Sequence, residues 1–354
     1  MTEIRIKRML QASKQVIKDC SLENGAIVAA NCFKDYFPKE AKYYTYVWPR
    51  DASFTCVAAD ILGIDLQESF FDWCINRAEG FLNTGLFYEK YFVNGLKALE
   101  RFQPDQTGSV LWAIWHHYKG DLKKALRFKN LIVKAADGIC NNWKIDHFVM
   151  VTNDLWEERL TFPDLKENWT YSLAACTKGL DCANEIIPCE RWKEVANMMR
   201  KRLENHFATY FVRSYGVLSD NGIDASVLGL VYPYEIFSPK DHRIVETIKE
   251  MEKKIVINGG LHRYENDVYD GWMHGTNQRN KGAGAWPLLN FWLSIYYARA
   301  GNKEKALQFY NWVLDRVDEF IPEQIFENDI QISVSPLCWS HSMFVMASKE
   351  LKYI

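Results

Sequence analysis

The run Tyr118-Lys119-Gly120-Asp121-Leu122-Lys123-Lys124-Ala125-Leu126 joins two helices, and it returns in nearly the same form as Arg299-Ala300-Gly301-Asn302-Lys303-Glu304-Lys305-Ala306-Leu307. The glycine favours the left-handed conformation that ends a helix, and the Asp or Asn is a typical cap for the next one. Leu62-Gly63-Ile64-Asp65 is a third joint, and Pro188 and Pro239 mark two more. The joints near 63, 120, 188, 239 and 301 are 57, 68, 51 and 62 residues apart, so the chain repeats one helical hairpin.

The helices on the two sides of each joint differ in character. The helix after a joint is amphipathic, whereas the helix before it is apolar nearly all round and must be enclosed by other elements. The enclosed runs are Ala52–Leu62, Val110–Tyr118, Tyr171–Ala183, Ala225–Tyr234, Trp286–Ala300 and Leu337–Ala347, and an amphipathic helix at Arg5–Lys18 adds the sixth outer partner. A closed ring gives every inner helix neighbours on both sides, whereas an open array would expose one at each end. We therefore predict an all-α barrel of six inner and six outer helices in alternation, formed by residues 1–354 as a single domain.

Composition narrows the functional classes. The chain has 48% hydrophobic and 25% charged residues with a formal net charge of −2, which indicates neither a nucleic-acid nor a membrane partner. The N-terminus lacks an apolar signal segment, and the nine cysteines show no CxxC spacing, so we expect reduced thiols in the cytoplasm. No metal or nucleotide motif is present, so we expect no cofactor. The 13 Trp and 18 Tyr mostly fill the core, although some are suited to stack on sugars in a cleft.

Polar segments precede the six inner helices. They are Trp48-Pro49-Arg50-Asp51, Gln103–Gly108, Trp156-Glu157-Glu158-Arg159, Asn221–Asp224, Arg263–Gly271 and Pro322-Glu323-Gln324. Because the inner helices of a closed ring run parallel, all six segments are expected to meet at one mouth. A glycosidase needs two separated carboxyl groups for the reaction and polar side chains that bind the sugar hydroxyls. The two separated glutamates and the Arg-Asp pair are suited to these roles.

Each polar residue also has a plainer interpretation. Asp51 and Asp224 are suitable N-caps, and Glu323 after a proline is suited to the first turn of a helix. The adjacent acids at 157 and 158 fit a solvated pair, and Arg263 can pair with Asp267 four residues later. Independent caps and surface pairs would have no reason to gather Arg, Asp, Glu and Trp in one cavity, so convergence favours the functional interpretation.

These segments resemble the glucoamylase family of inverting glycoside hydrolases, family fifteen. Trp48-Pro49-Arg50-Asp51-Ala52, Asp154-Leu155-Trp156-Glu157-Glu158 and Glu323-Gln324 with Trp339-Ser340 are similar to family segments. So are Asp224-Ala225-Ser226 and Arg263-Tyr264 with Asp267, Tyr269, Gly271 and Trp286. The matches keep the family order and cover most of the chain. The resemblance implies an (α/α)6 barrel that releases glucose from the non-reducing end of α-linked malto- or isomalto-oligosaccharides.

The resemblance also implies the roles of individual residues. Glu157 would be the general acid, Glu323 the general base and Glu158 a substrate-binding carboxylate. Arg50, Asp51 and Arg263 would hold the terminal glucose, with Trp48, Trp156, Asp267 and Trp286 completing the sugar site. We expect Glu158 and the Trp156 wall to raise the pKa of Glu157. An inverting mechanism further predicts that the two catalytic carboxyls stand about 6.5–9.5 Å apart.

The chain also departs from the family pattern. We expect it to begin almost at the barrel, without the N-terminal β-sandwich of prokaryotic members, and it carries an insert at 272–281 that is suited to a lid or an interface. Two rival functions remain open: a trehalase-like hydrolase, and a catalytically silent sugar-binding barrel. A terpene cyclase on a similar toroid would need a DDxxD metal cluster, which the sequence lacks.

Overall fold

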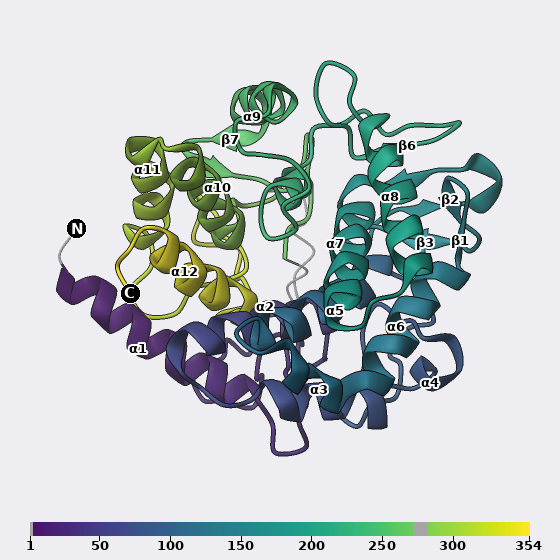
Figure 1. Cartoon of the computed structure of the whole chain (residues 1–354). Helices are drawn as coiled ribbons and strands as arrows, with labels where there is room; N and C mark the ends of the chain where they lie inside the picture. Colours follow the sequence, from purple (N-terminus) through teal and green to yellow (C-terminus); the bar gives the residue numbers. More distant parts are fainter. Residues whose placement is uncertain (1–2, 272–281) are drawn as a thin grey trace.

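The computed structural model describes residues 3–271 and 282–354, so the predicted lid or interface at 272–281 lies outside the described residues. The inner ring consists of α2 (Pro49–Leu62), α5 (Pro104–Tyr118), α7 (Thr170–Ile186), the 3-10 helix η3 (Ala225–Leu230), α10 (Pro287–Ala300) and α12 (Cys338–Glu350). Each of these packs against the next in this order, and α12 packs back against α2. The ring is therefore closed, and the predicted (α/α)6 barrel is confirmed (Figure 1).

The outer helices surround this ring (Figure 1). They are α1 (Glu3–Cys20), α3 (Gln67–Asn76), η1 (Leu122–Phe128) continued by α6 (Lys129–Asn141), α8 (Glu190–Glu204), α9 (His242–Ile255) and α11 (Lys303–Leu314). Short helices α4 (Phe81–Thr84) and η2 (Pro163–Leu165) lie in the connections. None of the helices within residues 3–271 and 282–354 combines the length and the apolar character needed to cross a membrane.

Burial follows the two helix types. In α10, every residue from Pro287 to Tyr297 is buried, as expected for a helix enclosed on all sides. In α9, burial is confined to one face, where Ile244, Ile248, Met251 and Ile255 recur at helical spacing. The inner helices also approach closely. A Cβ on Gly108 of α5 would lie 2.3 Å from the carbonyl oxygen of Ala175 in α7, so this crossing requires glycine.

The fourth inner helix differs from the prediction. We expected helix over Ala225–Tyr234, but the structure has only η3, which ends at Leu230. Gly229 has low helix propensity, and Pro233 disfavours helical geometry in the residue before it. Tertiary packing still places this short segment between α7 and α10, so the ring closes without a full helix there.

The joints also differ among themselves. Gly63 and Gly301 have the predicted left-handed conformation, with φ of 66° and 88°, and the side chain of Asn302 caps α11 by accepting from Lys305 N at 3.1 Å. Asp121, in contrast, makes no capping hydrogen bond. The segment after it begins as the 3-10 helix η1 instead of an α-helix.

Within the described part of the chain, four two-stranded antiparallel ladders connect helices. They pair β1 (Trp143–Lys144) with β2 (His147–Phe148), β3 (Thr152–Asn153) with β4 (Leu160–Thr161), β5 (Asn168–Trp169) with β6 (Ser214–Tyr215), and β7 (Val256–Ile257) with β8 (Gly260–Leu261). In the second ladder, Thr152 pairs with Thr161 and Asn153 with Leu160. This hairpin holds the intervening residues 154–159, which include both candidate glutamates of that segment.

Candidate active site

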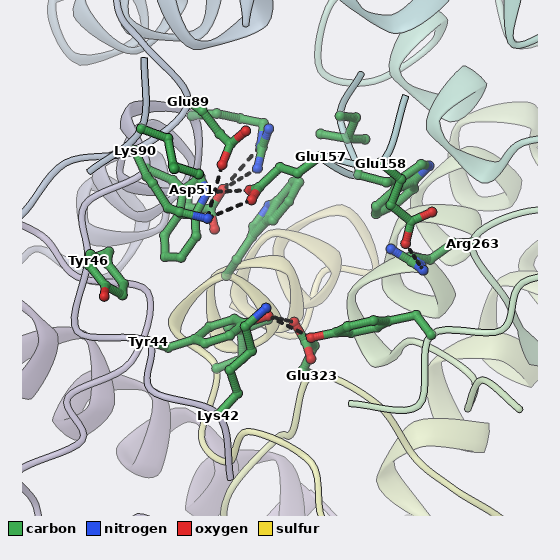
Figure 2. A pocket seen from close by; sticks show the side chains of 18 of the residues that line it. Lys42, Tyr44, Tyr46, Asp51, Glu89, Lys90, Glu157, Glu158, Arg263 and Glu323 are labelled. Carbon is green, nitrogen blue, oxygen red and sulfur yellow. Dashed lines mark hydrogen bonds and ion pairs between the residues drawn. The ribbon is translucent and has the colours of Figure 1, made fainter. Parts of the chain in front are cut away.

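One cavity of about 370 Å³ opens at the end of the barrel where the inner helices begin. Its walls include Trp48, Arg50, Asp51, Trp156, Glu157, Glu158, Arg263, Trp286 and Glu323, which are all the predicted site residues except Asp267. Four of the six polar segments therefore reach the lining. The segments 103–108 and 221–224 instead support it from behind, through Asp105 and Asp224. Figure 2 shows the Glu157 and Glu323 side chains on opposite sides of this pocket.

The Arg50-Asp51 pair lies in the first turn of α2, after a proline at the helix start. Asp51 is therefore not the N-cap of this helix, which is Trp48. The Arg50 guanidinium donates to Asp51 Oδ1 at 3.1 Å and to Asp105 Oδ2 at 3.0 Å, and it lies over the Trp339 ring. Burial raises the pKa of Asp51 to about 6, although the charge of Arg50 opposes this. The pair forms a rigid fork of donors and acceptors at the cavity wall.

A tight turn presents the two adjacent glutamates. Asp154 Oδ1 accepts from the backbone amides of Glu158 at 2.8 Å and Arg159 at 3.1 Å, which closes the turn. Glu157 has φ of 64°, a left-handed conformation that is uncommon for a residue with a side chain. Such strain persists where the surroundings impose it, and it is concentrated at functional sites. The turn sends Glu157 and Glu158 to different partners, so they are not a solvated pair.

Glu157 is held by donors from two other segments. Its Oε1 accepts from Trp48 Nε1, and its Oε2 lies 2.9 Å from Lys90 Nζ. Burial opposes ionisation, but the charge of Lys90, hydrogen bonds from Glu89 and Lys90 and the charge of Arg50 together lower the pKa of Glu157. We expected Glu158 and Trp156 to raise this pKa, and that expectation is wrong because the nearest charge is the Lys90 ammonium.

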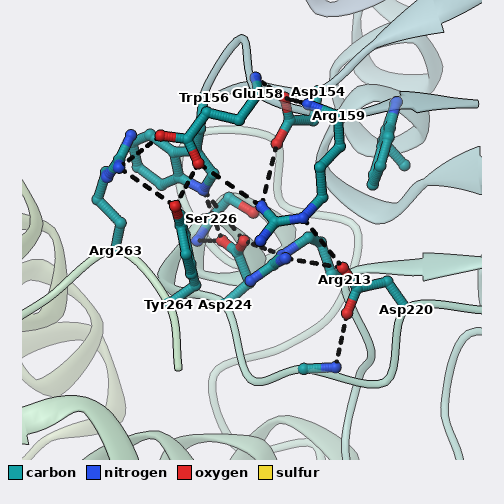
Figure 3. Close-up of polar contacts among 12 residues, drawn as sticks. Asp154, Trp156, Glu158, Arg159, Arg213, Asp220, Asp224, Ser226, Arg263 and Tyr264 are labelled. Atoms are coloured by element: carbon teal, nitrogen blue, oxygen red, sulfur yellow. Dashed lines mark hydrogen bonds and ion pairs between the residues drawn. The ribbon is translucent and has the colours of Figure 1, made fainter. Parts of the chain in front are cut away.

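Glu158 takes part in a separate ion-pair network (Figure 3). Its Oε1 accepts from Arg263 Nη2 at 2.7 Å, and its Oε2 accepts from Tyr264 OH. The same guanidinium donates to both carboxylate oxygens of Asp267 at 2.7 Å, as the four-residue spacing predicted. The Asp267 side chain is 1% exposed and lies outside the cavity lining. Asp267 therefore orients Arg263, and Arg263 is the group that reaches the cavity.

Trp156 is oriented from behind in the same way (Figure 3). Its Nε1 donates to Asp224 Oδ1 and Oδ2 at 3.1 and 3.0 Å, while Arg213 Nε donates to Asp224 Oδ2 at 2.6 Å. Asp224 also accepts from Ser226 N at 2.8 Å, so it is the N-cap of η3 as well. The Trp156 and Trp286 rings meet edge-on with centroids 5.6 Å apart. Two large aromatic faces thereby form a fixed corner of the cavity.

Glu323 lies across the cavity from Glu157, in the loop before α12 and not in a helical first turn. Its Oε1 accepts from Tyr44 OH at 2.7 Å, and Tyr44 OH lies 3.1 Å from Tyr269 OH. Its Oε2 is buried and has no hydrogen-bond partner among the described residues. Burial raises the pKa of Glu323 to about 7, although Tyr44, Lys42 and Arg263 oppose the shift. This carboxyl is therefore near half ionisation at neutral pH.

Sequence reasoning missed Tyr44, Glu89 and Lys90, which all line the cavity. None of them belongs to the six polar segments that precede the inner helices, so the topological argument had no reason to select them. The available signal was the charged pair Glu89-Lys90 set between Tyr88 and Tyr91. Reciprocal backbone hydrogen bonds between Val47 and Tyr91, at 2.8 and 2.9 Å, bring this loop beside Trp48.

A helical barrel whose mouth holds two carboxyl groups across an aromatic-lined cavity has the architecture of a glycoside hydrolase. Residues 75–317 match the sequence profile described as Glycosyl hydrolases family 15. The chain is also 30% identical to an uncharacterized glycosyl hydrolase of Methanocaldococcus jannaschii, in a match that covers 92% of this chain and 53% of the relative. The chain belongs to glycosyl hydrolase family 15.

Two relatives have named activities, and the match with this chain covers a different share of each. An isomaltose glucohydrolase of Kribbella flavida is 24% identical over 98% of this chain and 93% of the relative. Trehalase 1 of Sulfolobus acidocaldarius is 25% identical over 73% of this chain and 43% of the relative. The chain thus spans about half the length of the M. jannaschii protein and of this trehalase.

Solved structures show the same fold. A glycosidase, solved as a single-residue variant, superposes with a TM-score of 0.81 at 23% identity, covering 99% of this chain and 98% of that one. A bacterial glucoamylase complexed with acarbose superposes with a TM-score of 0.72 at 20% identity, covering 97% of this chain and 55% of that one.

Proposed function

We propose that this chain is an inverting α-glucosidase that releases glucose from the non-reducing end of malto- or isomalto-oligosaccharides. The observation that carries this proposal is the placement of Glu157 and Glu323 on opposite walls of one cavity. Inversion requires an acid on one face of the sugar ring and a base with its water on the other. The isomaltose glucohydrolase among the relatives and the glucose and acarbose complexes among the similar structures support an α-glucoside as substrate.

The cavity is suited to a short sugar. Its volume of about 370 Å³ is at the small end of ligand sites, about 300–1,000 Å³, which favours exo-cleavage over binding along a polymer. Trp286 Nε1, Trp339 Nε1 and Glu323 Oε2 belong to lining residues and have no hydrogen-bond partner within the described residues. Buried polar atoms without partners are costly, and sugar hydroxyls or the attacking water would satisfy them.

In the proposed reaction, Glu157 donates a proton to the leaving glycosidic oxygen while the bond from that oxygen to the anomeric carbon breaks. Glu323 takes a proton from the water whose oxygen attacks the opposite face of that carbon. Arg50 and Asp51 hold the hydroxyls of the terminal glucose, and Arg263 and Glu158 hold others. These contacts fix the ring while positive charge develops on it.

The measured product anomer tests this mechanism. Proton NMR of the early product from an α-linked substrate should show β-glucose, whereas α-glucose would mean retention. Glu157→Gln and Glu323→Gln should each bind sugar yet lose about 10²–10⁴-fold in turnover. Near-normal hydrolysis by both variants would refute the assignment of these two glutamates, whereas an absence of hydrolysis by the wild-type chain would favour a silent sugar-binding barrel.

Trehalose hydrolysis is the second candidate, because the chain is 25% identical to a trehalase over 73% of its length. A free-glucose assay across maltose, isomaltose, trehalose, dextrin and soluble starch distinguishes the two. The proposal predicts that maltose or isomaltose is cleaved with the highest kcat/KM, and a preference for trehalose would replace it.

A further inference from the structure

Glu89 has a buried carboxyl group that lies beside the candidate acid Glu157. The proposed reaction has not yet given Glu89 a role. Its side chain is 0% exposed, and its Oε1 lies 3.0 Å from Lys90 Nζ. The same ammonium lies 2.9 Å from Glu157 Oε2, so one cation is placed between two carboxyl groups (Figure 2). Three ionised groups would leave this part of the site with one excess negative charge in a poorly solvated place, which is costly.

The groups around Glu89 compensate only part of this charge. Asn153 Nδ2 donates to Glu89 Oε2 at 2.6 Å and is neutral. Arg101 Nη1 is 3.9 Å from the same oxygen, and its side chain is 49% exposed, so solvent screens it. Lys42 also interacts with Glu89, and Glu323 draws on the charge of the same ammonium. A proton shared by the carboxyl groups of Glu89 and Glu157 would neutralise the excess negative charge without a further cation.

We propose that Glu89 is a positioning residue that shares one proton with Glu157 and thereby keeps the candidate acid supplied beside Lys90. This inference rests on the proposed function of Glu157. Burial and the neighbouring charge of Glu157 raise the pKa of Glu89 to about 7, while the pKa of Glu157 is lowered. Two carboxyls coupled in this way titrate as a pair, so the proton belongs to both.

Each turnover uses one proton from the Glu89–Glu157 pair. The proton moves from the Glu89 carboxyl to the Glu157 carboxylate, and Glu157 then transfers it to the leaving oxygen. Both carboxylates are left ionised around the Lys90 ammonium. Water supplies the next proton, while the proton that Glu323 took from the attacking water returns to solvent. No oxidant, reductant or other reactant is required.

The test compares leaving groups in Glu89→Gln. Glucosyl fluoride departs as fluoride and needs little protonation, whereas a disaccharide needs the acid. We expect kcat/KM for the disaccharide to fall at least tenfold, kcat/KM for the fluoride to fall less than threefold, and the disaccharide pH optimum to move to lower pH. Glu89→Asp, which keeps the carboxyl, should recover part of the loss. Glu100→Gln is the matched control, because Glu100 is on the same loop and forms an exposed ion pair with Lys97 at 2.8 Å.

An equal loss for both substrates, or no loss for either, would overturn the proposal. If Glu89→Gln does not fold, a carboxyl titration of the wild-type protein with ¹³C-labelled glutamate decides the question. One proton retained by this pair above pH 5 supports the proposal, and two fully ionised carboxyls at pH 5 refute it. Failure of the proposed function is separate, because then Glu157→Gln itself would still hydrolyse the disaccharide.

Discussion

Removing one hydroxyl should change the pH dependence of the proposed hydrolysis. Tyr44 OH donates to Glu323 Oε1 at 2.7 Å and opposes the effect of burial, which raises the pKa of Glu323 to about 7. Tyr44→Phe removes that donor while it leaves the ring in place. A hydrogen bond to a charged group contributes about 1.5–3 kcal/mol, so the pKa of Glu323 should rise by about 1 to 2 units.

The size of the effect on activity follows from the ionised fraction. At pH 7, the fraction of Glu323 that can act as a base falls from about a half to between about 0.09 and 0.01. We therefore expect kcat/KM at pH 7 to fall about 5- to 50-fold, and the pH optimum to move up by about half to one unit. The assay is glucose release at low substrate concentration across about pH 5 to 9.

Tyr297→Phe is the matched control, since Tyr297 OH donates to Glu252 Oε1 at 2.6 Å near the far end of α10. This variant should keep the wild-type profile. An unchanged optimum in Tyr44→Phe, or an equal loss at every pH, would refute the reasoning, because the hydroxyl would then not control the ionisation of Glu323.

Three further outcomes concern stability. Because the folded-state pKa of Glu323 is raised from 4.5 to about 7, the free energy of unfolding should decline as pH rises through this window. Urea titrations should show that the free energy of unfolding of Glu323→Gln, relative to that of wild type, increases by about 3 kcal/mol from the low-pH end of this window to the high-pH end. A difference that stays constant with pH would contradict this. Arg263→Met leaves the carboxylates of Glu158 and Asp267 without their cation and should lower the free energy of unfolding by about 3–5 kcal/mol. The Arg159 side chain is 35% exposed, so Arg159→Met should lower it by less than about 1 kcal/mol. Equal losses would argue against a buried ion-pair network around Arg263. Gly108→Ala should destabilise by about 1–3 kcal/mol in thermal unfolding, while Gly120→Ala, which has open space around its Cβ position, should not.

The helical repeat could be predicted because its causes are local. Apolar residues all round one helix and on one face of the next specify inner and outer positions, and Gly63 and Gly301 mark helix ends by their conformational freedom. The prediction failed where local signals competed with one another. Gly229 and Pro233 shortened the fourth inner helix, and Asp121 lacked the α-helical turn that it was expected to cap.

The sequence brought most of the predicted polar residues to one cavity, but it did not predict their electrostatics. Parallel inner helices bring their preceding segments to one end, which is why Arg50, Glu157, Arg263 and Glu323 line one cavity. Asp267 was placed in the sugar site by its motif, but its carboxylate is turned to Arg263 and away from the lining.

The amino-acid sequence alone determined the ring of helical hairpins and the end of it that carries the polar segments, because both depend on periodicity and chain order. Only the tertiary structure decided which charges act on each glutamate. Lys90 is 67 residues from Glu157 along the chain, yet its ammonium is 2.9 Å away and reverses the expected direction of the pKa shift. Coulomb energies depend on distance and solvent exposure, and both are set by contacts between segments that no local pattern records.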